Sequence, residues 1–76
     1  MRENEIKGKI IRIDEDKGFT IIKSKNDSEQ TYLGHFSVFN DSDIDLNHTL
    51  INRDVAFIPE YNGKMNRFEA TYVRII

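Results

Sequence analysis

The sequence contains no cysteine, a single proline and two histidines. The absence of cysteine excludes disulfides and thiolate metal sites, and it is the usual composition of an intracellular protein. With two histidines and no thiol to ligate an ion, we expect neither a metal site nor another cofactor. No apolar run approaches the roughly 20 residues that a membrane-spanning helix needs, and residues 1–5 are polar, so we expect no signal peptide. The expected setting is cytoplasmic, without a membrane partner.

The chain has 76 residues, which suits one domain, and we expect residues 1–76 to fold as a single unit. A domain of this size buries only about 60% of the surface of its unfolded chain, so its stability should be marginal, roughly 3–5 kcal/mol. Hydrophobic residues make up 38% of the chain and charged residues 32%. This balance is typical of a folded protein and not of a disordered one.

The net charge of −2 does not by itself indicate a nucleic-acid-binding protein. Its distribution is uneven. Residues 1–25 hold seven Lys/Arg and five Asp/Glu, whereas residues 26–76 hold four and eight. Three of the acidic residues, Asp41, Asp43 and Asp45, fall in one polar stretch. The charges either give the protein a basic and an acidic face or simply keep a small domain soluble.

Short runs rich in β-branched and aromatic residues alternate with turn formers, and no segment has the period of a long amphipathic helix. One turn closes on Gly18, and Asn62-Gly63 suits a two-residue type I′ hairpin. Pro59 places its strand at a sheet edge or near a strand end, because proline cannot donate to a ladder. Residues 37–52 lack a strand pattern, as functional loops often do. Strands are predicted near residues 6–13, 18–23, 30–36, 54–60 and 67–75.

Five such strands cannot bury both faces of an open sheet at this length. Closing into a barrel removes most exposed edges and yields one core. We therefore predict an all-β fold, a small five-stranded antiparallel Greek-key barrel.

Alternation along the second and third strands predicts a shared surface. Phe19 and Ile21 lie on one face of their strand, with Thr20 and Ile22 on the other. Leu33 and His35 share a face of the next strand, so neighbouring antiparallel strands bring the four together, with Phe36 nearby. This set is either an outward stacking surface for bases, with Lys17 beside it, or part of the core, with the opposite face exposed.

Two segments carry a resemblance to a known family. Residues 17–22 read Lys-Gly-Phe-Thr-Ile-Ile, and residues 32–37 read Tyr-Leu-Gly-His-Phe-Ser. They resemble the Lys-Gly-Phe-Gly-Phe-Ile and Val-Phe-Val-His-Phe-Ser motifs of the cold-shock domain family, and the resemblance covers the chain from Gly8 onward. It implies an oligonucleotide-binding (OB) fold, an outward platform and binding of single-stranded RNA or DNA with little base preference, as in RNA chaperones.

The sequence also departs from the family pattern. The usual tryptophan position of the first strand holds Arg12, and the phenylalanine after it is Ile13. Ile21 and Leu33 replace two further rings. Arg12 can still stack its guanidinium on a base, whereas the aliphatic side chains supply no π-face. If each lost ring removes about 1–2 kcal/mol, three losses weaken binding by several orders of magnitude.

The predicted function is therefore a binding module and not an enzyme, because no catalytic constellation is present. Phe19, His35 and Phe36 would stack bases, and Ile21 and Leu33 would fill the gaps between them. The expected phosphate contacts are Arg12 and Lys17, supported by Lys9, Lys23 and Arg67. Lys64 and Arg67 flank the last hairpin and are equally compatible with ordinary surface charges. Tyr61 either adds a ring at the rim or caps the core.

An alternative is a protein-interaction module on the same barrel. Ile21, Leu33 and Phe36 would then form an aliphatic patch that binds a protein partner or a second copy of the chain in a weak homodimer. The replacement of rings by aliphatic residues and the acidic net charge favour this alternative. Salt dependence separates the two functions, because phosphate contacts weaken with salt and an apolar contact is less sensitive.

Overall fold

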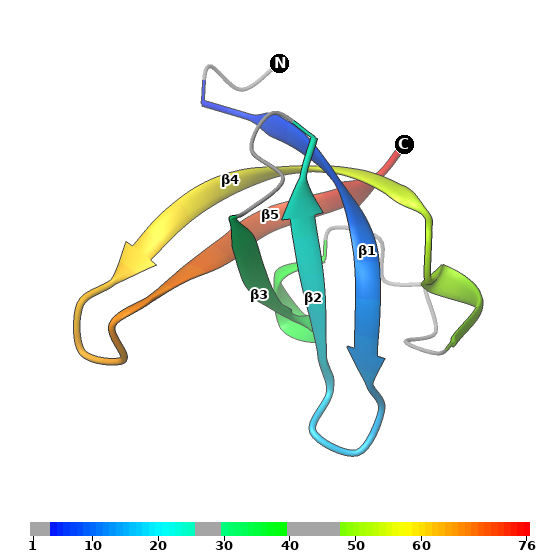
Figure 1. The fold of residues 1–76 in the computed structure, drawn as a ribbon, viewed down its shortest axis with the longest axis horizontal. Helices are drawn as coiled ribbons and strands as arrows, with labels where there is room; N and C mark the ends of the chain where they lie inside the picture. Colours follow the sequence, from blue (N-terminus) through cyan, green and yellow to red (C-terminus); the bar gives the residue numbers. More distant parts are fainter. Residues whose placement is uncertain (1–3, 26–29, 40–47) are drawn as a thin grey trace.

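The computed structural model describes residues 4–25, 30–39 and 48–76. These ranges contain five strands and two short 3-10 helices (Figure 1), and no helix among them is long and apolar enough to cross a membrane. All five predicted strands are present, with bounds within two residues of those expected. The predicted acidic stretch with Asp41, Asp43 and Asp45 lies outside the described residues. The elements are β1 (Ile6–Asp14), β2 (Phe19–Ser24), β3 (Thr31–His35), η1 (Phe36–Val38), η2 (His48–Leu50), β4 (Asp54–Asn62) and β5 (Arg67–Ile75).

The strands close into a barrel in the order β1-β2-β3-β5-β4. The prediction of an entirely antiparallel barrel is wrong at one pair, because β3 and β5 run parallel. Antiparallel neighbours alternate in direction, so a closed ring with an odd number of strands cannot alternate throughout. The parallel ladder is small: β3 and β5 pair at one position, Leu33 with Glu69, and a bridge beyond β3 joins Phe39 to Val73.

A bulge in β1 decides which of its side chains face outward. Ile10 pairs with Ile22 and Arg12 with Ile21, so the extra residue is Ile11. Before the bulge Ile10 is fully buried, and after it Arg12 is exposed. A bulge shifts the alternation by one residue and bends the strand. The bulge thereby places Arg12 outward, although Arg12 is only two positions from the core residue Ile10.

The core is formed by the inward face of all five strands together with Leu50 of η2. Thr20 and Ile22 on β2 are fully buried, which settles the orientation left open by the sequence, because Phe19 and Ile21 then face outward. The Thr20 hydroxyl donates to the Gly34 carbonyl at 2.9 Å, so this buried polar group is satisfied. The hydrophobic core comprises Ile10, Ile22, Tyr32, Leu50, Val55, Phe57, Ala70 and Val73.

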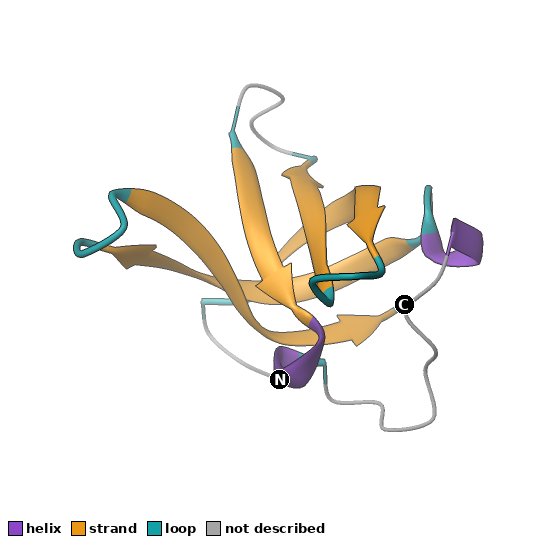
Figure 2. Ribbon diagram, turned by 90° about the horizontal axis from the view of Figure 1, so that it is seen from below, coloured by secondary structure: helices purple, strands orange, loops and turns teal. Residues whose placement is uncertain are grey.

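The β4–β5 hairpin extends away from the rest of the barrel in both views (Figures 1 and 2). Its turn is not the predicted two-residue type I′ turn, because Asn62 still pairs with Arg67 and a four-residue loop joins them. The Asn62 side chain explains the difference. Its Oδ1 accepts hydrogen bonds from the backbone N–H groups of Lys64 and Met65 at 3.1 and 3.2 Å. Asn66, the last residue of this loop, has a positive φ of 53°.

Pro59 occupies the part of β4 that pairs with β5 alone, since β1 pairs with β4 only as far as Phe57. The predicted edge position is therefore confirmed. Strand β4 continues past the proline to Asn62, because beyond Phe57 it has a ladder partner on one side only, where a proline is tolerated.

We expect Gly8→Ala to destabilise the barrel. A Cβ at Gly8 would lie 2.7 Å from the Lys23 carbonyl oxygen and 2.8 Å from Ile22 Cγ2, so β1 and β2 would have to move apart. Overpacking of this kind lowers the free energy of unfolding by about 1–3 kcal/mol, which urea denaturation measures directly. The matched control is Gly63→Ala, whose nearest neighbour is 4.0 Å away and which should change stability by less than about 0.5 kcal/mol. Equal midpoints for the two variants would contradict the expected crowding.

Candidate nucleic-acid interface

The outward faces of β1, β2 and β3 form three cross-strand rows. Each row is fixed by backbone pairing, so its members are neighbours regardless of side-chain conformation. The predicted grouping of Phe19, Ile21, Leu33 and His35 is confirmed by the register, which pairs Phe19 with His35 and Ile21 with Leu33. The rows are Asp14–Phe19–His35, Arg12–Ile21–Leu33 and Lys9–Lys23–Thr31.

Rings gather at one end of this surface, next to the turn between β1 and β2. The rings of His35 and Phe36 have centroids 5.0 Å apart and planes inclined by 35°. Phe36 is 56% exposed, and it begins η1 instead of ending the third strand as predicted. Its backbone N–H donates to the Gly18 carbonyl at 2.9 Å, which holds η1 against the turn.

Gly18 is required by this arrangement for two reasons. Its φ of 74° is in the left-handed region, and a Cβ there would lie 3.1 Å from the Phe36 ring. Its N–H donates to the Asp14 carbonyl at 2.8 Å and closes the turn predicted from the sequence. The glycine therefore lets the ring of Phe36 lie directly against the backbone of the turn.

The orientation of His35 is set by Ser37. The Ser37 backbone N–H donates to His35 Nδ1 at 3.3 Å, and the Ser37 hydroxyl lies 2.9 Å from the same nitrogen. Because Nδ1 accepts the backbone hydrogen, the proton of the neutral ring is on Nε2. The exposed ring is thus held in one orientation, with an N–H group available to a ligand.

The middle of the surface is aliphatic. Ile21 and Leu33 are half-buried and lie between the ring cluster and the row formed by Lys9, Lys23 and Thr31. Arg12 pairs with Ile21 and supplies the planar group of this row. A base placed here would contact branched side chains and a guanidinium instead of the three rings that the family pattern would put at these positions.

Four exposed cations surround the surface: Lys9, Arg12, Lys17 and Lys23. Within the described part of the chain none of them is in an ion pair, whereas Lys25 pairs with Asp54 at 3.1 Å. The described residues hold ten Lys/Arg and seven Asp/Glu, so the barrel itself carries a positive formal charge. Six of the thirteen acidic residues fall in the remaining segments, which explains why the net charge of the chain is negative.

Arg67 is oriented by the carboxylate of Glu69, the β5 residue that pairs with Leu33. Its Nε donates to Glu69 Oε2 at 2.8 Å, and Asn62 Nδ2 donates to the same oxygen at 3.3 Å. These two hydrogen bonds, that of Arg67 above all, lower the pKa of Glu69. Arg67 is therefore partly neutralised, unlike the four cations of the β1–β3 surface.

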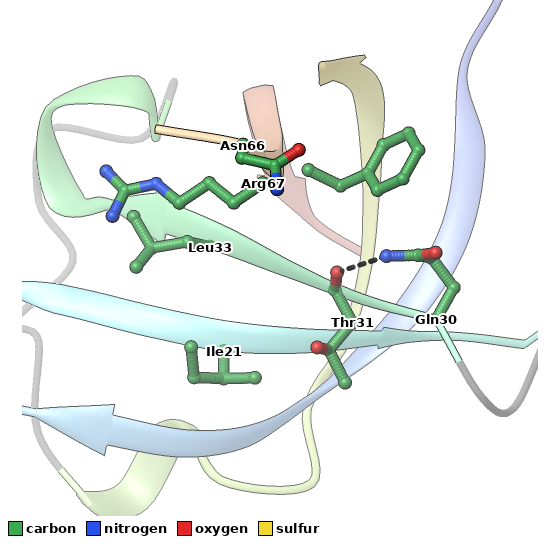
Figure 3. A pocket seen from close by; sticks show the side chains of 7 residues that line it. Ile21, Gln30, Thr31, Leu33, Asn66 and Arg67 are labelled. Atoms are coloured by element: carbon green, nitrogen blue, oxygen red, sulfur yellow. Dashed lines mark hydrogen bonds between the residues drawn. The ribbon is translucent and has the colours of Figure 1, made fainter. Parts of the chain in front are cut away.

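Phe68 is a residue that the sequence patterns did not single out. Its ring is 40% exposed and lies edge-on to Tyr61 at 5.1 Å and to the core ring of Tyr32 at 5.8 Å. Tyr61, 52% exposed, lies at the rim and does not cap the core. Phe68 lines an open cavity of about 340 Å³ together with Ile21, Leu33 and Arg67 (Figure 3). No local signal could have found it, because β3 and β5 are far apart in sequence.

A closed five-stranded barrel with an outward surface on β1–β3 defines a protein of the OB-fold class. The structure of Drosophila Unr CSD456 is similar to this chain, with a TM-score of 0.75 and 19% sequence identity. The similarity covers 97% of this chain and 27% of that one, so the chain spans about a quarter of its length. No family model and no curated protein matches the sequence. The cold-shock type of fold predicted from the two motifs is thereby confirmed.

The Glu69 interaction predicts a pH dependence of stability. A carboxylate whose pKa is lowered by folding stabilises the protein above its unfolded pKa, near 4.5, and this contribution is lost as the pH falls through the folded pKa. An exposed pair of this kind contributes about 1 kcal/mol or less. In urea denaturation between pH 7 and pH 3, we expect Glu69→Gln to lose stability less steeply than the wild type.

Arg67→Gln removes the same interaction from the other side and should flatten the curve in the same way. Parallel curves for the wild type and both variants would contradict the role of this pair.

Proposed function

We propose that this protein is a single-stranded nucleic-acid-binding module with a reduced aromatic platform. The observation that carries the proposal is the convergence of three rings and four cations on the outward face of β1–β3 and its adjoining turns, where none of the cations is in an ion pair with a described residue. Phe19, His35 and Phe36 form the stacking end. The cations that surround them are Lys9, Arg12, Lys17 and Lys23.

Each part of this surface suits a different part of a single strand. Rings stack on bases of any sequence, at about 1–3 kcal/mol for each base, and lysines neutralise phosphates. The row of Arg12, Ile21 and Leu33 offers packing and one guanidinium, so it adds less to the affinity than a row of rings would. The stacking surface is compatible with both RNA and DNA, because base faces are common to both.

The fold neighbour supports the proposal as an analogy, because it shares the cold-shock type of fold and the resemblance of residues 17–22 and 32–37 to that family implies single-stranded nucleic-acid binding. We infer a role like that of an RNA chaperone, in which weak and base-tolerant binding traps strands that open transiently. Weak binding suits this role, because a strand must be released before it can pair again.

Phe19→Ala tests the stacking end. Phe19 pairs with His35 across the strands, so its loss removes one ring and leaves the cations unchanged. We expect the affinity for oligo-dT and for unstructured oligo-U to fall about tenfold, measured by fluorescence titration at about 50 mM salt. Tyr72→Ala removes a ring that is 51% exposed on β5, and it should leave the affinity unchanged. An unchanged affinity in Phe19→Ala, with an unchanged melting temperature, would argue against the platform.

Salt dependence tests the phosphate contacts. If all four cations contact phosphates, the logarithm of the association constant should fall with the logarithm of the salt concentration with a slope of about −3. This amounts to a loss of about 50-fold between about 50 and 200 mM salt. Lys23→Gln should reduce the slope by about 0.7. Binding that salt does not weaken would instead indicate an apolar contact, and no binding at about 100 μM protein would refute the function.

A further inference from the structure

The β4–β5 hairpin carries the dipeptide Asn62-Gly63, which the structure does not use as the predicted type I′ turn. It is the only Asn-Gly pair in the sequence. The hairpin extends away from the barrel (Figures 1 and 2), and Gly63 is exposed. Beyond its chain neighbours, a Cβ built on Gly63 would find no atom nearer than Tyr61 Cε2, at 4.0 Å. The backbone that follows Asn62 is thus accessible to solvent and has no side chain to shield it.

The amide group of Asn62 is held by three hydrogen bonds. Its Oδ1 accepts the backbone N–H groups of Lys64 and Met65 at 3.1 and 3.2 Å. Its Nδ2 donates to Glu69 Oε2 at 3.3 Å. Two donors on the same carbonyl oxygen make Cγ more electrophilic, and they stabilise negative charge on Oδ1 as the donors of an oxyanion hole do. The amide is therefore prepared for attack at Cγ.

The nucleophile next to this carbon is the backbone nitrogen of Gly63. A bond from this nitrogen to Asn62 Cγ closes a succinimide ring, and a reaction within one chain gains from proximity. Among the described residues, no hydrogen bond engages the Gly63 N–H. Glycine also leaves the approach uncrowded, because it has no Cβ. Nucleophile and activated carbonyl thus belong to consecutive residues of one exposed loop.

We propose that Asn62 is a deamidation site of the folded protein. The Gly63 nitrogen, after losing its proton to hydroxide, forms a bond to Asn62 Cγ, and the electron pair of the C=O bond moves onto Oδ1. The carbonyl then re-forms, the Cγ–Nδ2 bond breaks, and Nδ2 takes a proton from water and leaves as ammonia. One water hydrolyses the succinimide at either carbonyl, which leaves aspartate or isoaspartate at position 62. Water is the only co-reactant, and nothing is oxidised or reduced.

The modification replaces a hydrogen bond by a repulsion. In the aspartate form, the oxygen that takes the place of Nδ2 faces Glu69 Oε2, which Nδ2 approaches at 3.3 Å. Arg67 Nε lies 2.8 Å from the same Glu69 oxygen, so one guanidinium then faces two carboxylates. Isoaspartate also lengthens the backbone by a methylene at the last pair of the β4–β5 ladder, Asn62 with Arg67. Both products weaken the end of the hairpin. This inference involves no nucleic-acid ligand, so it is independent of the proposed function.

Peptide mapping of the aged, folded chain tests the site. The full chain is kept at physiological temperature and mildly alkaline pH and is digested with trypsin at intervals. Cleavage after Arg53 and Lys64 releases residues 54–64, in which Asn62 is the only asparagine. We expect mass spectrometry to find the mass gain of one deamidation in this peptide. The rate should be at least that of a synthetic peptide of residues 58–68, because the folded loop holds both donors on Oδ1.

A digest at time zero measures deamidation caused by the digestion itself. If the synthetic peptide reacts and the folded chain does not, the folded loop protects Asn62 and the proposal is wrong.

Gly63→Ala is the matched variant. Its Cβ has room in the folded protein, so its melting temperature should equal that of the wild type. The same Cβ crowds the approach of the nitrogen to Asn62 Cγ, and we expect deamidation to slow about tenfold or more. Equal rates in the two proteins would overturn the proposed attack by the Gly63 nitrogen.

Asn66 is the internal control. It lies in the same loop, but the residue after it is Arg67, whose side chain hinders the corresponding attack. Its tryptic peptide, residues 65–67, should stay unmodified while Asn62 reacts. Equal modification of Asn62 and Asn66 would show unselective ageing of exposed amides and would overturn a specific site.

Asn62→Asp reproduces one product and tests its effect on the hairpin. We expect its melting temperature at neutral pH to be about 2–4 °C lower than that of the wild type. In a Glu69→Gln background, where only one carboxylate remains, the same change should lower it by less than about 1 °C. The deamidated fraction of the aged wild type, separated by ion exchange, should show at least the shift of Asn62→Asp. Equal melting temperatures for Asn62→Asp and the wild type would overturn the proposed repulsion.

Discussion

Closure of five strands into one ring is the constraint on which the rest of this structure depends. An odd number of strands cannot alternate in direction all the way round, so β3 and β5 must meet as a parallel pair. That pair is short, and on the side where both strands begin they separate. The closure that buries the core therefore also leaves an open cavity that Leu33 and Phe68 line.

The candidate interface combines rigid and adaptable parts. The Gly18 turn, the Phe36 backbone hydrogen bond and the Ser37–His35 contacts hold the ring cluster in place. A preorganised surface loses less conformational entropy on binding. The surrounding lysines are long and exposed, and they can follow a phosphate backbone in several conformations. This division suits a ligand with uniform base faces and a flexible backbone.

Net charge is a poor guide to this protein because its charges are segregated. The described barrel has an excess of Lys/Arg, and six acidic residues lie in the segments outside it. On the barrel, Glu69 and Asp54 are paired with Arg67 and Lys25, whereas the four cations of the β1–β3 surface are in no ion pair among the described residues. At physiological salt the field acts over about 8 Å, so local charge matters more to a bound strand than the total.

The sequence by itself determined the strands, the Gly18 turn and the grouping of Phe19, Ile21, Leu33 and His35 on one face, because alternation and hairpin pairing are local. The cross-strand pairs within that group came from the structure. Its reading of Asn62-Gly63 as a type I′ turn was wrong, because the Asn62 side chain caps a longer loop. Alternation alone would bury Arg12 with Ile10, and the resemblance to cold-shock domains was needed to assign it to the surface. Only the tertiary structure decided the bulge that turns Arg12 outward, the parallel β3–β5 pair and the position of Phe68 beside Leu33. These depend on how a five-stranded ring closes, and closure joins strands whose sequences carry no information about one another.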